Sequence, residues 1–172
     1  MPATSDDLLS FLRRLRAVKE YTTEPVSDAQ IEAILEVGRW SGSGGNRQPW
    51  DVVVVRDPDL KAKMGDWGAR PAATAAVVLL VVMQNENPSL DEGRLAERLC
   101  LGAAAVGLGS TVATLKNEGP AQVKELLGIP PERRAVCVVA IGHTDAAARR
   151  ARPANPNAGR KPLAEFAHWD RF

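Results

Sequence analysis

Ten residues from Ser41 to Trp50, which read SGSGGNRQPW, combine backbone freedom with directed polar groups. Their glycines have no Cβ, so the main chain can approach a flat ligand closely. Ser43, Asn46 and Gln48 carry donors and acceptors that can read the heteroatom edge of a planar ring. This loop therefore predicts a site for a planar ligand. The alternative is a polar connection between a helix and a strand, in which the glycines only turn the chain.

Two cations stand three residues apart in the segment RAVKEY, residues 16–21. The guanidinium of Arg16 can donate two hydrogen bonds to a phosphate, and the ammonium of Lys19 can approach a neighbouring anion as a compact charge. Cations are also common at a helix C-terminus without any ligand, because they favour the negative end of the helix dipole. Both interpretations stay open on this segment alone.

The length and composition fit one soluble globular domain over residues 1–172. The chain has 45% hydrophobic and 25% charged residues, and its formal net charge is +1. So small a charge argues against broad electrostatic binding to nucleic acid. The longest apolar run, residues 72–83, is too short to span a bilayer, and the first residues do not read as a secretion signal. We therefore expect no membrane partner and a cytoplasmic location.

Neither metal binding nor nucleophilic catalysis is indicated by the residue types. Cys100 and Cys137 lie in apolar surroundings, which predicts buried thiols. His143 and His168 stand apart from any carboxylate or cysteine cluster, so we interpret both as structural. The tryptophans have a large apolar area that favours a core or interface role. We predict no metal and no catalytic side chain.

Periodicity predicts helices that alternate with strands along the chain. Helical spacing of apolar residues covers a segment from a cap at Thr4 or Ser5 to Leu15, and then 27–38, 58–65, 91–108 and 120–127. Ser27 and Gln30 form a capping-box pattern at the start of the second helix. Strands are predicted over 50–55, 75–83, 109–115 and 134–141. The first strand is apolar almost throughout, so we expect it to be covered on both faces.

The predicted helix over 91–108 is rich in glycine and alanine. Small residues allow another helix to pack at close range. That helix can belong to a second subunit, or the small residues can be buried within the same domain. Residues 148–172 have no periodicity and are expected to form an extended basic arm.

Three segments resemble, in order and spacing, the motifs of the nitroreductase family of FMN-dependent oxidoreductases. They are LRAVKEYTTEPV (15–26), WSGSGGNRQPWDVVVVRD (40–57) and GRKPLAEFAHW (159–169). The resemblance covers nearly the whole chain. It implies an α+β fold with a central mixed or antiparallel sheet flanked by helices. It also implies a homodimer built on the long central helix, with one FMN per subunit at the interface.

The resemblance implies ten cofactor-binding positions: Arg16, Ala17, Lys19, Gly42, Ser43, Asn46, Gln48, Thr114, Leu115 and Arg160. The three cations fall where the family holds the phosphate, the ribityl chain and the pyrimidine edge. The loop residues line the isoalloxazine, with Gly42 in place of the usual proline. Thr114 and Leu115 belong to the segment 111–116, in which the family directs a backbone N–H at flavin N5.

Departures from the family pattern occur at three places. Leu15 stands where the family often has arginine, and Ala17 where it often has serine, so Arg13, Arg14 or the tail arginines 149, 150 and 152 are candidates to replace a phosphate contact. The polar stretch 84–93 is short, which implies an open flavin face. Asp66 and Arg70 are further polar candidates near the cofactor.

The implied activity is that of an FMN-dependent NAD(P)H oxidoreductase. NADH or NADPH reduces the flavin, and a small electron-poor acceptor such as a nitroaromatic, a quinone or an activated alkene then takes its place in a ping-pong cycle. The fold that the resemblance implies also permits reductive removal of a halogen or oxygen-dependent destruction of the flavin. A non-catalytic flavin-binding or nucleotide-binding protein is the alternative from another class. Resemblance of fold does not identify the acceptor.

Overall fold

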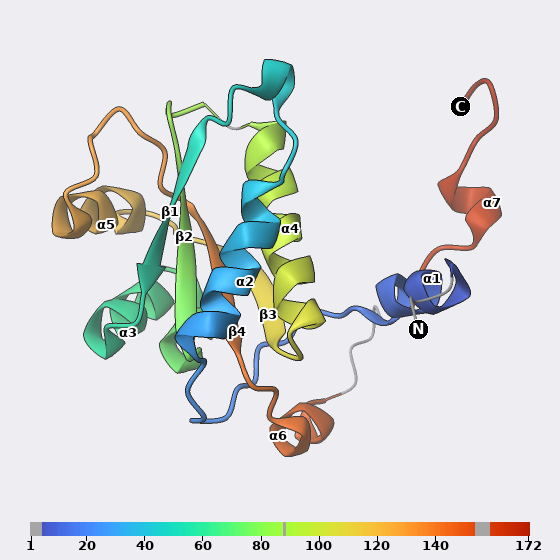
Figure 1. The fold of residues 1–172 in the computed structure, drawn as a ribbon, viewed down its shortest axis with the longest axis horizontal. Helices are drawn as coiled ribbons and strands as arrows, with labels where there is room; N and C mark the ends of the chain where they lie inside the picture. The colour runs from blue at the N-terminus through green and yellow to red at the C-terminus, as the bar shows by residue number, and fades with distance from the viewer. Residues whose placement is uncertain (1–4, 88, 154–158) are drawn as a thin grey trace.

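The computed structural model describes residues 5–87, 89–153 and 159–172. Its centre is an antiparallel sheet with the strand order β1-β2-β4-β3 (Figure 1). The strands are β1 (Trp50–Val55), β2 (Val77–Met83), β3 (Gly109–Thr114) and β4 (Cys137–Gly142). Strands β2 and β4 are central, and β1 and β3 form the two edges. All pairings within this sheet are antiparallel, so the antiparallel alternative of the predicted sheet is the one observed.

Helices cover both faces of the sheet. On one face, α2 (Asp28–Arg39) and α4 (Leu90–Ala105) pack against side chains such as Leu79 and Ile141. On the other, α3 (Pro58–Asp66), α5 (Gly119–Leu127) and the short turn η2 (Arg70–Thr74) pack against side chains such as Leu80 and Val138. Successive residues of β2 and β4 point to opposite faces, so both central strands are buried throughout. The α+β fold class is confirmed.

Local signals in the sequence account for the helix ends. Ser27 and Gln30 form the predicted capping box of α2. The carboxylate of Asp57 accepts the backbone N–H of Leu60 at 2.7 Å and caps α3. Gly128 ends α5 in the left-handed conformation, with φ 64°. Capping side chains satisfy backbone groups that a helix terminus leaves unpaired, which is why these boundaries were predictable.

Close packing of α2 against α4 explains two glycines of these helices. A Cβ on Gly102 would lie 3.2 Å from Ile34 Cα, and a Cβ on Gly38 would lie 2.5 Å from Leu99 Cδ2. The buried side of α4 therefore meets a helix of the same chain, as in the second alternative that the sequence left open. The opposite side of α4, which includes Arg94 and Arg98, is exposed.

One expectation about a single element is wrong and another holds only in part. Strand β1 packs on both faces, because Val53 and Val55 contact one core cluster and Trp50 and Val52 the other; the cover is incomplete at this edge strand, where Asp51 and Val54 are exposed. The C-terminal arm is not extended throughout, because α6 (Ala146–Ala151) and α7 (Leu163–Phe166) are helical. Asp145 caps α6 by accepting the N–H groups of residues 147 and 148.

Apolar side chains outside the sheet remain exposed in the single chain. Helix α1 (Ser5–Arg14) buries none of its residues and exposes Leu8, Leu9 and Leu12. Helix α7 exposes Leu163 and Phe166, and both helices stand away from the sheet on the right of Figure 1. The Thr4 alternative for the cap of α1 lies outside the described residues.

Candidate functional site

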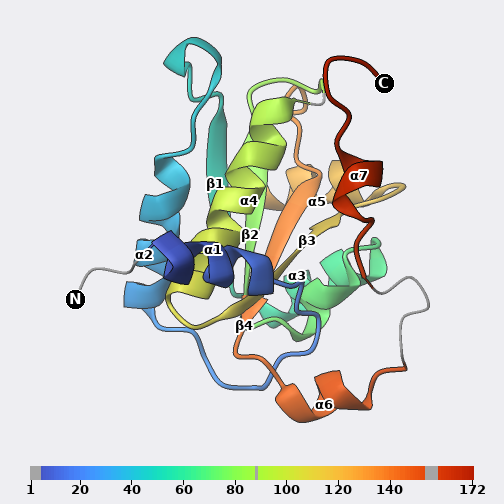
Figure 2. The same ribbon diagram turned by 90° about the vertical axis from the view of Figure 1, so that its right-hand side faces the viewer.

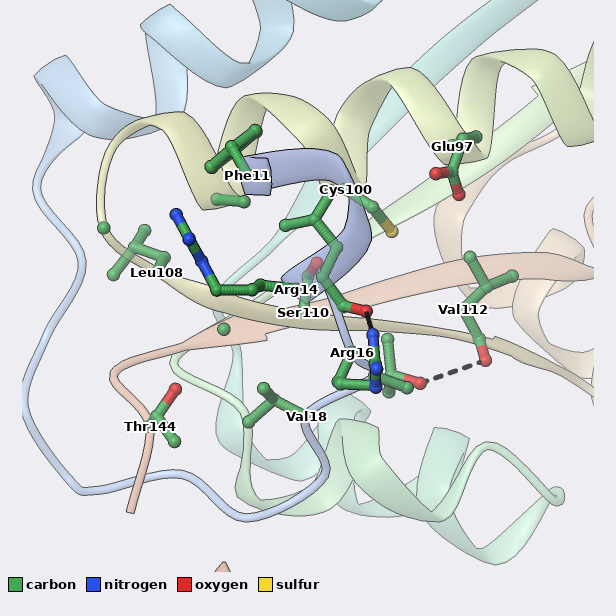
Figure 3. A pocket seen from close by; sticks show the side chains of 16 residues that line it. Phe11, Arg14, Arg16, Val18, Glu97, Cys100, Leu108, Ser110, Val112 and Thr144 are labelled. Carbon is green, nitrogen blue, oxygen red and sulfur yellow. Dashed lines mark hydrogen bonds between the residues drawn. The ribbon is translucent and has the colours of Figure 1, made fainter. Parts of the chain in front are cut away.

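Two open cavities lie along the outer edge of β3. The first, about 590 Å³, is bounded by the end of α1, the C-terminal part of α4 and the start of β3, and it includes Arg16 and Ala17. Figure 3 shows Arg14, Arg16, Cys100 and Ser110 around it. The second cavity, about 480 Å³, includes Lys19 and Thr114. Since Val112 lines both cavities, they adjoin along the strand.

Backbone pairing determines which N–H groups of β3 face these cavities. The carbonyl of Ser110 accepts the N–H of Val18 at 2.8 Å, on the outer side of the strand. The N–H of Leu115 instead donates to the carbonyl of Val136 at 2.9 Å, on the β4 side. Because residues of a strand alternate between the two sides, the N–H groups of Val112 and Thr114 point to the outer edge. Leu115 is 3% exposed and packs in the core.

Arg16 and Lys19 stand in different cavities. The Nη1 of Arg16 donates to the carbonyls of Arg13 and Leu15, each at 2.7 Å, and the side chain is exposed. Lys19 is followed by Glu20, whose carboxylate lies 3.1 Å from Arg152 Nη1. The other oxygen of the Glu20 carboxylate is buried without a hydrogen-bond partner among the described residues.

The glycine loop has an unusual backbone. Residues Gly45, Asn46 and Gln48 have φ angles of 59°, 53° and 48°. Left-handed conformations at residues other than glycine are uncommon, cost about 1 kcal/mol or more each and are frequent at ligand sites. The Ser43 hydroxyl accepts the N–H of Gln48 at 2.9 Å and braces the loop. A Cβ on Gly42 would overlap the guanidinium of Arg94, which is the end of an exposed side chain and can move aside.

The glycine loop and the first cavity lie at opposite ends of α4. The N–H of Gly44 donates to the carboxylate of Asp91 in the first turn of α4, at 3.3 Å, whereas Ala104 in its last turn lines the first cavity. Thirteen residues separate Asp91 from Ala104, and a helix of that length spans roughly 20 Å. Figure 2 shows the loop at the upper end of β1, across the sheet from β3. One chain therefore brings Arg16, Ala17, Lys19 and Thr114 to one edge, and leaves the predicted loop residues at the other.

Arg160 joins neither group. Its Nη1 donates to the carbonyl of Gly159 at 2.7 Å, and its side chain is exposed. The described part of the C-terminal segment, residues 159–172, contains α7 and lies away from the sheet on the right of Figure 1.

Three cations of the second cavity were not among the predicted cofactor-binding positions. Arg70, Lys116 and Arg152 line it together with Lys19. Arg70 and Arg152 were noted only as further candidates, and Lys116 only as the last residue of the segment 111–116. Their convergence depends on contacts between η2 and β3 and on the ion pair of Arg152 with Glu20, for which a single sequence contains no local signal.

The thiols are poor nucleophiles in this fold. Burial raises the pKa of the Cys137 thiol to about 12 and also raises that of Cys100, so both are protonated at neutral pH. Cys137 is buried as predicted and Cys100 is half-buried. Within residues 5–87, 89–153 and 159–172, no group of three or more histidine, cysteine or acidic residues could hold a metal. Over the same residues, no helix is long and apolar enough to cross a membrane.

Known proteins resemble this chain over most of its length. A protein of Archaeoglobus fulgidus named "Putative NADH dehydrogenase/NAD(P)H nitroreductase" is 30% identical over 154 residues, which cover 80% of this chain and 86% of the relative. The iodotyrosine deiodinase of Nematostella vectensis is 26% identical and covers 96% of this chain and 76% of its own length.

Solved structures share the fold. An FMN-dependent nitroreductase from Clostridium difficile R20291 has a TM-score of 0.79 at 20% identity and covers 95% of this chain and 99% of its own. The NADPH:FMN oxidoreductase from Vibrio harveyi has a TM-score of 0.78 at 22% identity and covers 95% and 77%. Residues 12–90 and 71–143 match the Nitroreductase family. Because this match spans most of the chain and agrees with the relative at 30% identity, the chain belongs to the nitroreductase family.

Proposed function

We propose that this chain is an FMN-dependent NAD(P)H oxidoreductase that reduces small electron-poor acceptors, and that a second copy of the chain completes each flavin site. The names of the relatives support the activity: an NAD(P)H nitroreductase, an NADPH-flavin oxidoreductase and an FMN-dependent nitroreductase are among them. The observation that carries the proposal is the outer edge of β3, where an outward N–H and unpaired cations border the same cavities.

The residues at this edge fit the needs of a flavin. A flavin ring presents acceptor atoms along one edge, and the N–H of Thr114 is, with that of Val112, a donor that the strand directs outward. The N–H of Leu115 is engaged by Val136, so of the two predicted residues we assign the N5 contact to Thr114. Lys19 lies in the same cavity as Thr114, which suits a cation beside the pyrimidine edge. Arg16 borders the adjoining cavity and is assigned to the phosphate, with Arg160 as its partner.

A second copy supplies what this edge lacks. Neutral amides that can read the ring, Asn46 and Gln48, precede β1 and so lie at the opposite edge of the sheet in the same chain. The exposed side of α4 and the exposed leucines of α1 are surfaces that a homodimer would cover. In such a dimer, the glycine loop of one copy faces the β3 edge of its partner.

When bound, FMN supplies the redox chemistry, taking a hydride from NADH or NADPH and passing electrons to the acceptor. The chain orients the ring and stabilises charge. We assign Lys19 to the negative charge that reduction puts near N1, since a preorganised cation stabilises developing charge. Hydride transfer requires close contact and alignment more than a side-chain acid or base. This explains how an enzyme can work with protonated thiols.

Reductive removal of a halogen is the second candidate. It is favoured by one observation, that the iodotyrosine deiodinase of Nematostella vectensis matches 96% of this chain.

We further propose that residues 1–172 form one domain with residues 148–172 as its arm. We also propose that the protein works in the cytosol, a compartment that supplies NADH and NADPH.

Visible spectroscopy of the purified protein tests the function. We expect a yellow protein that releases FMN on denaturation and is bleached by NADH or NADPH without oxygen. A nitroaromatic, a quinone or a halogenated phenol is then added, and the acceptor that restores the colour distinguishes the two reactions. A protein that stays colourless with added FMN would contradict the proposal. A yellow protein that neither nucleotide bleaches would be a binding protein without turnover.

A further inference from the structure

Four cations surround the second cavity along β3. Lys19 follows α1, Arg70 begins η2, Lys116 follows β3 and Arg152 ends α6, so four separate segments contribute them. The residues that line this cavity include no aspartate or glutamate. Like charges that converge on one concave surface raise the local concentration of anions.

Backbone and side-chain contacts within the chain hold Lys116 and Arg152 at this cavity. The N–H of Lys116 donates to the carbonyl of Trp67 at 2.7 Å. The carbons of the Lys116 side chain lie against Gly68, where an added Cβ would come within 3.0 to 3.3 Å of them. Gly68 has φ 102°, a conformation that favours glycine. Arg152 is held by its ion pair with Glu20. Their positions are therefore set by the fold without any ligand.

Three of these cations have no counter-charge in the single chain. Among the described residues, Lys19, Arg70 and Lys116 form no ion pair and no side-chain hydrogen bond. Arginines at the far end of the sheet differ, because Arg133 pairs with Asp51 and Arg134 with Glu92. An anion in the second cavity would relieve the mutual repulsion of the unpaired cations.

The proposed flavin does not use all of this charge. Its ring edge needs one cation, which we assigned to Lys19, and its phosphate was assigned to Arg16 at the first cavity and to Arg160 of the C-terminal segment. Lys116 and Arg70 remain unpaired beside the ring. Resting on the proposed function, we propose that Lys116, with Arg70 and Arg152 beside it, binds an anionic group of the acceptor. The preferred acceptors are then electron-poor organic anions that carry a carboxylate or sulfonate.

A matched pair of acceptors tests this proposal in the flavin-loaded protein. The probes are 4-nitrobenzoate and its neutral methyl ester, with Lys116→Gln as the variant and Lys63→Gln, an exposed lysine of α3, as the control for lost charge. We expect Lys116→Gln to raise KM and the dissociation constant for 4-nitrobenzoate about tenfold, the effect of losing roughly 1.4 kcal/mol of binding. Its kcat, its FMN content and its KM for the ester should stay at wild-type values. Lys116→Arg should restore the affinity, and Lys63→Gln should change nothing.

The dissociation constant is obtained by titrating the visible spectrum of the oxidised protein, so the test does not depend on turnover. Equal effects on the anion and the ester, or no effect on either, would overturn the proposal. Loss of FMN from Lys116→Gln would mean that Lys116 binds the flavin, and this result would also overturn the proposal. An effect on NADPH but not on NADH or 4-nitrobenzoate would assign the charge to the nucleotide phosphate instead. Wild-type protein that binds no FMN would remove the proposed function itself, an outcome visible before any variant is compared.

Discussion

The two edges of the sheet carry different chemistry. At the β1 edge, a loop with left-handed residues presents neutral amides and a hydroxyl. At the β3 edge, the strand directs backbone N–H groups outward between cations. Strands β2 and β4 separate the edges by three inter-strand spacings, about 14 Å. In the proposed function, each edge supplies half of what a flavin needs, and the pairing of two copies joins the halves.

Within the β3 edge, we expect the largest difference in stability effect between changes at the adjacent residues Leu115 and Thr114. Leu115→Ala should lower the free energy of unfolding by about 2 to 5 kcal/mol, because it leaves a cavity in the core. Thr114→Ala should change it by less than about 0.5 kcal/mol, because that side chain is exposed. Urea denaturation of both variants measures the difference. Similar losses in the free energy of unfolding for the two variants would mean that Leu115 does not face the core while Thr114 faces the site.

Removing the phosphate cation should weaken flavin binding strongly. Arg16→Ala should lose a charge-assisted contact of about 1.5 to 3 kcal/mol, which raises the dissociation constant of FMN by roughly 10- to 100-fold. Fluorescence of released FMN measures this constant, and Lys63→Ala serves as the control. If the variant retains FMN as wild type does, the phosphate lies elsewhere.

Removing the ring cation should change the redox potential rather than the occupancy. Lys19→Met should lower the flavin midpoint potential by on the order of 30 mV, which corresponds to about 1.4 kcal/mol for a two-electron couple. Equilibration with a reference dye under anaerobic conditions measures the shift. An unchanged or higher potential would exclude Lys19 from this role.

The smallest effect is expected beside the glycine loop. Hydrogen bonds from Arg39 and the Trp40 indole lower the pKa of Glu36 to about 2. Because the pKa is lowered on folding, this contribution to stability is complete above the ordinary glutamate pKa and is lost as the pH falls through about 2. The Trp40 indole N–H resonance should shift with that midpoint and not near pH 4.5. A midpoint at the ordinary value would show that the contact does not persist in solution.

Sequence patterns predicted the helices and strands themselves better than which elements lie next to one another in the fold. The capping box at Ser27 and the apolar run of β2 are local signals, and both were confirmed. The edge position of β1 was missed, because a run of valines reads alike in a central and in an edge strand. Helix α6 was missed, because the basic residues around it suggested an arm and the cap at Asp145 was overlooked.

Much of the candidate site could not be predicted from local sequence patterns. The loop at 41–50 and the cations at 16 and 19 were found from residue types, since glycines, amides and arginines have direct chemical uses. The choice between Thr114 and Leu115 depends on pairing with β4 and Val136. The gathering of Lys116 and Arg152 depends on segments that meet only in the folded chain.

Subunit mixing tests the composite site most directly. One parent carries Arg16→Ala and Lys19→Ala, the other carries Asn46→Ala and Gln48→Ala, and each alone should bind little FMN. After the parents are unfolded and refolded together, mixed dimers should contain one intact site, so FMN binding should return to about one quarter of wild type under random pairing. No recovery in a mixture that contains mixed dimers would contradict the account, because it would mean that a single copy holds the whole site.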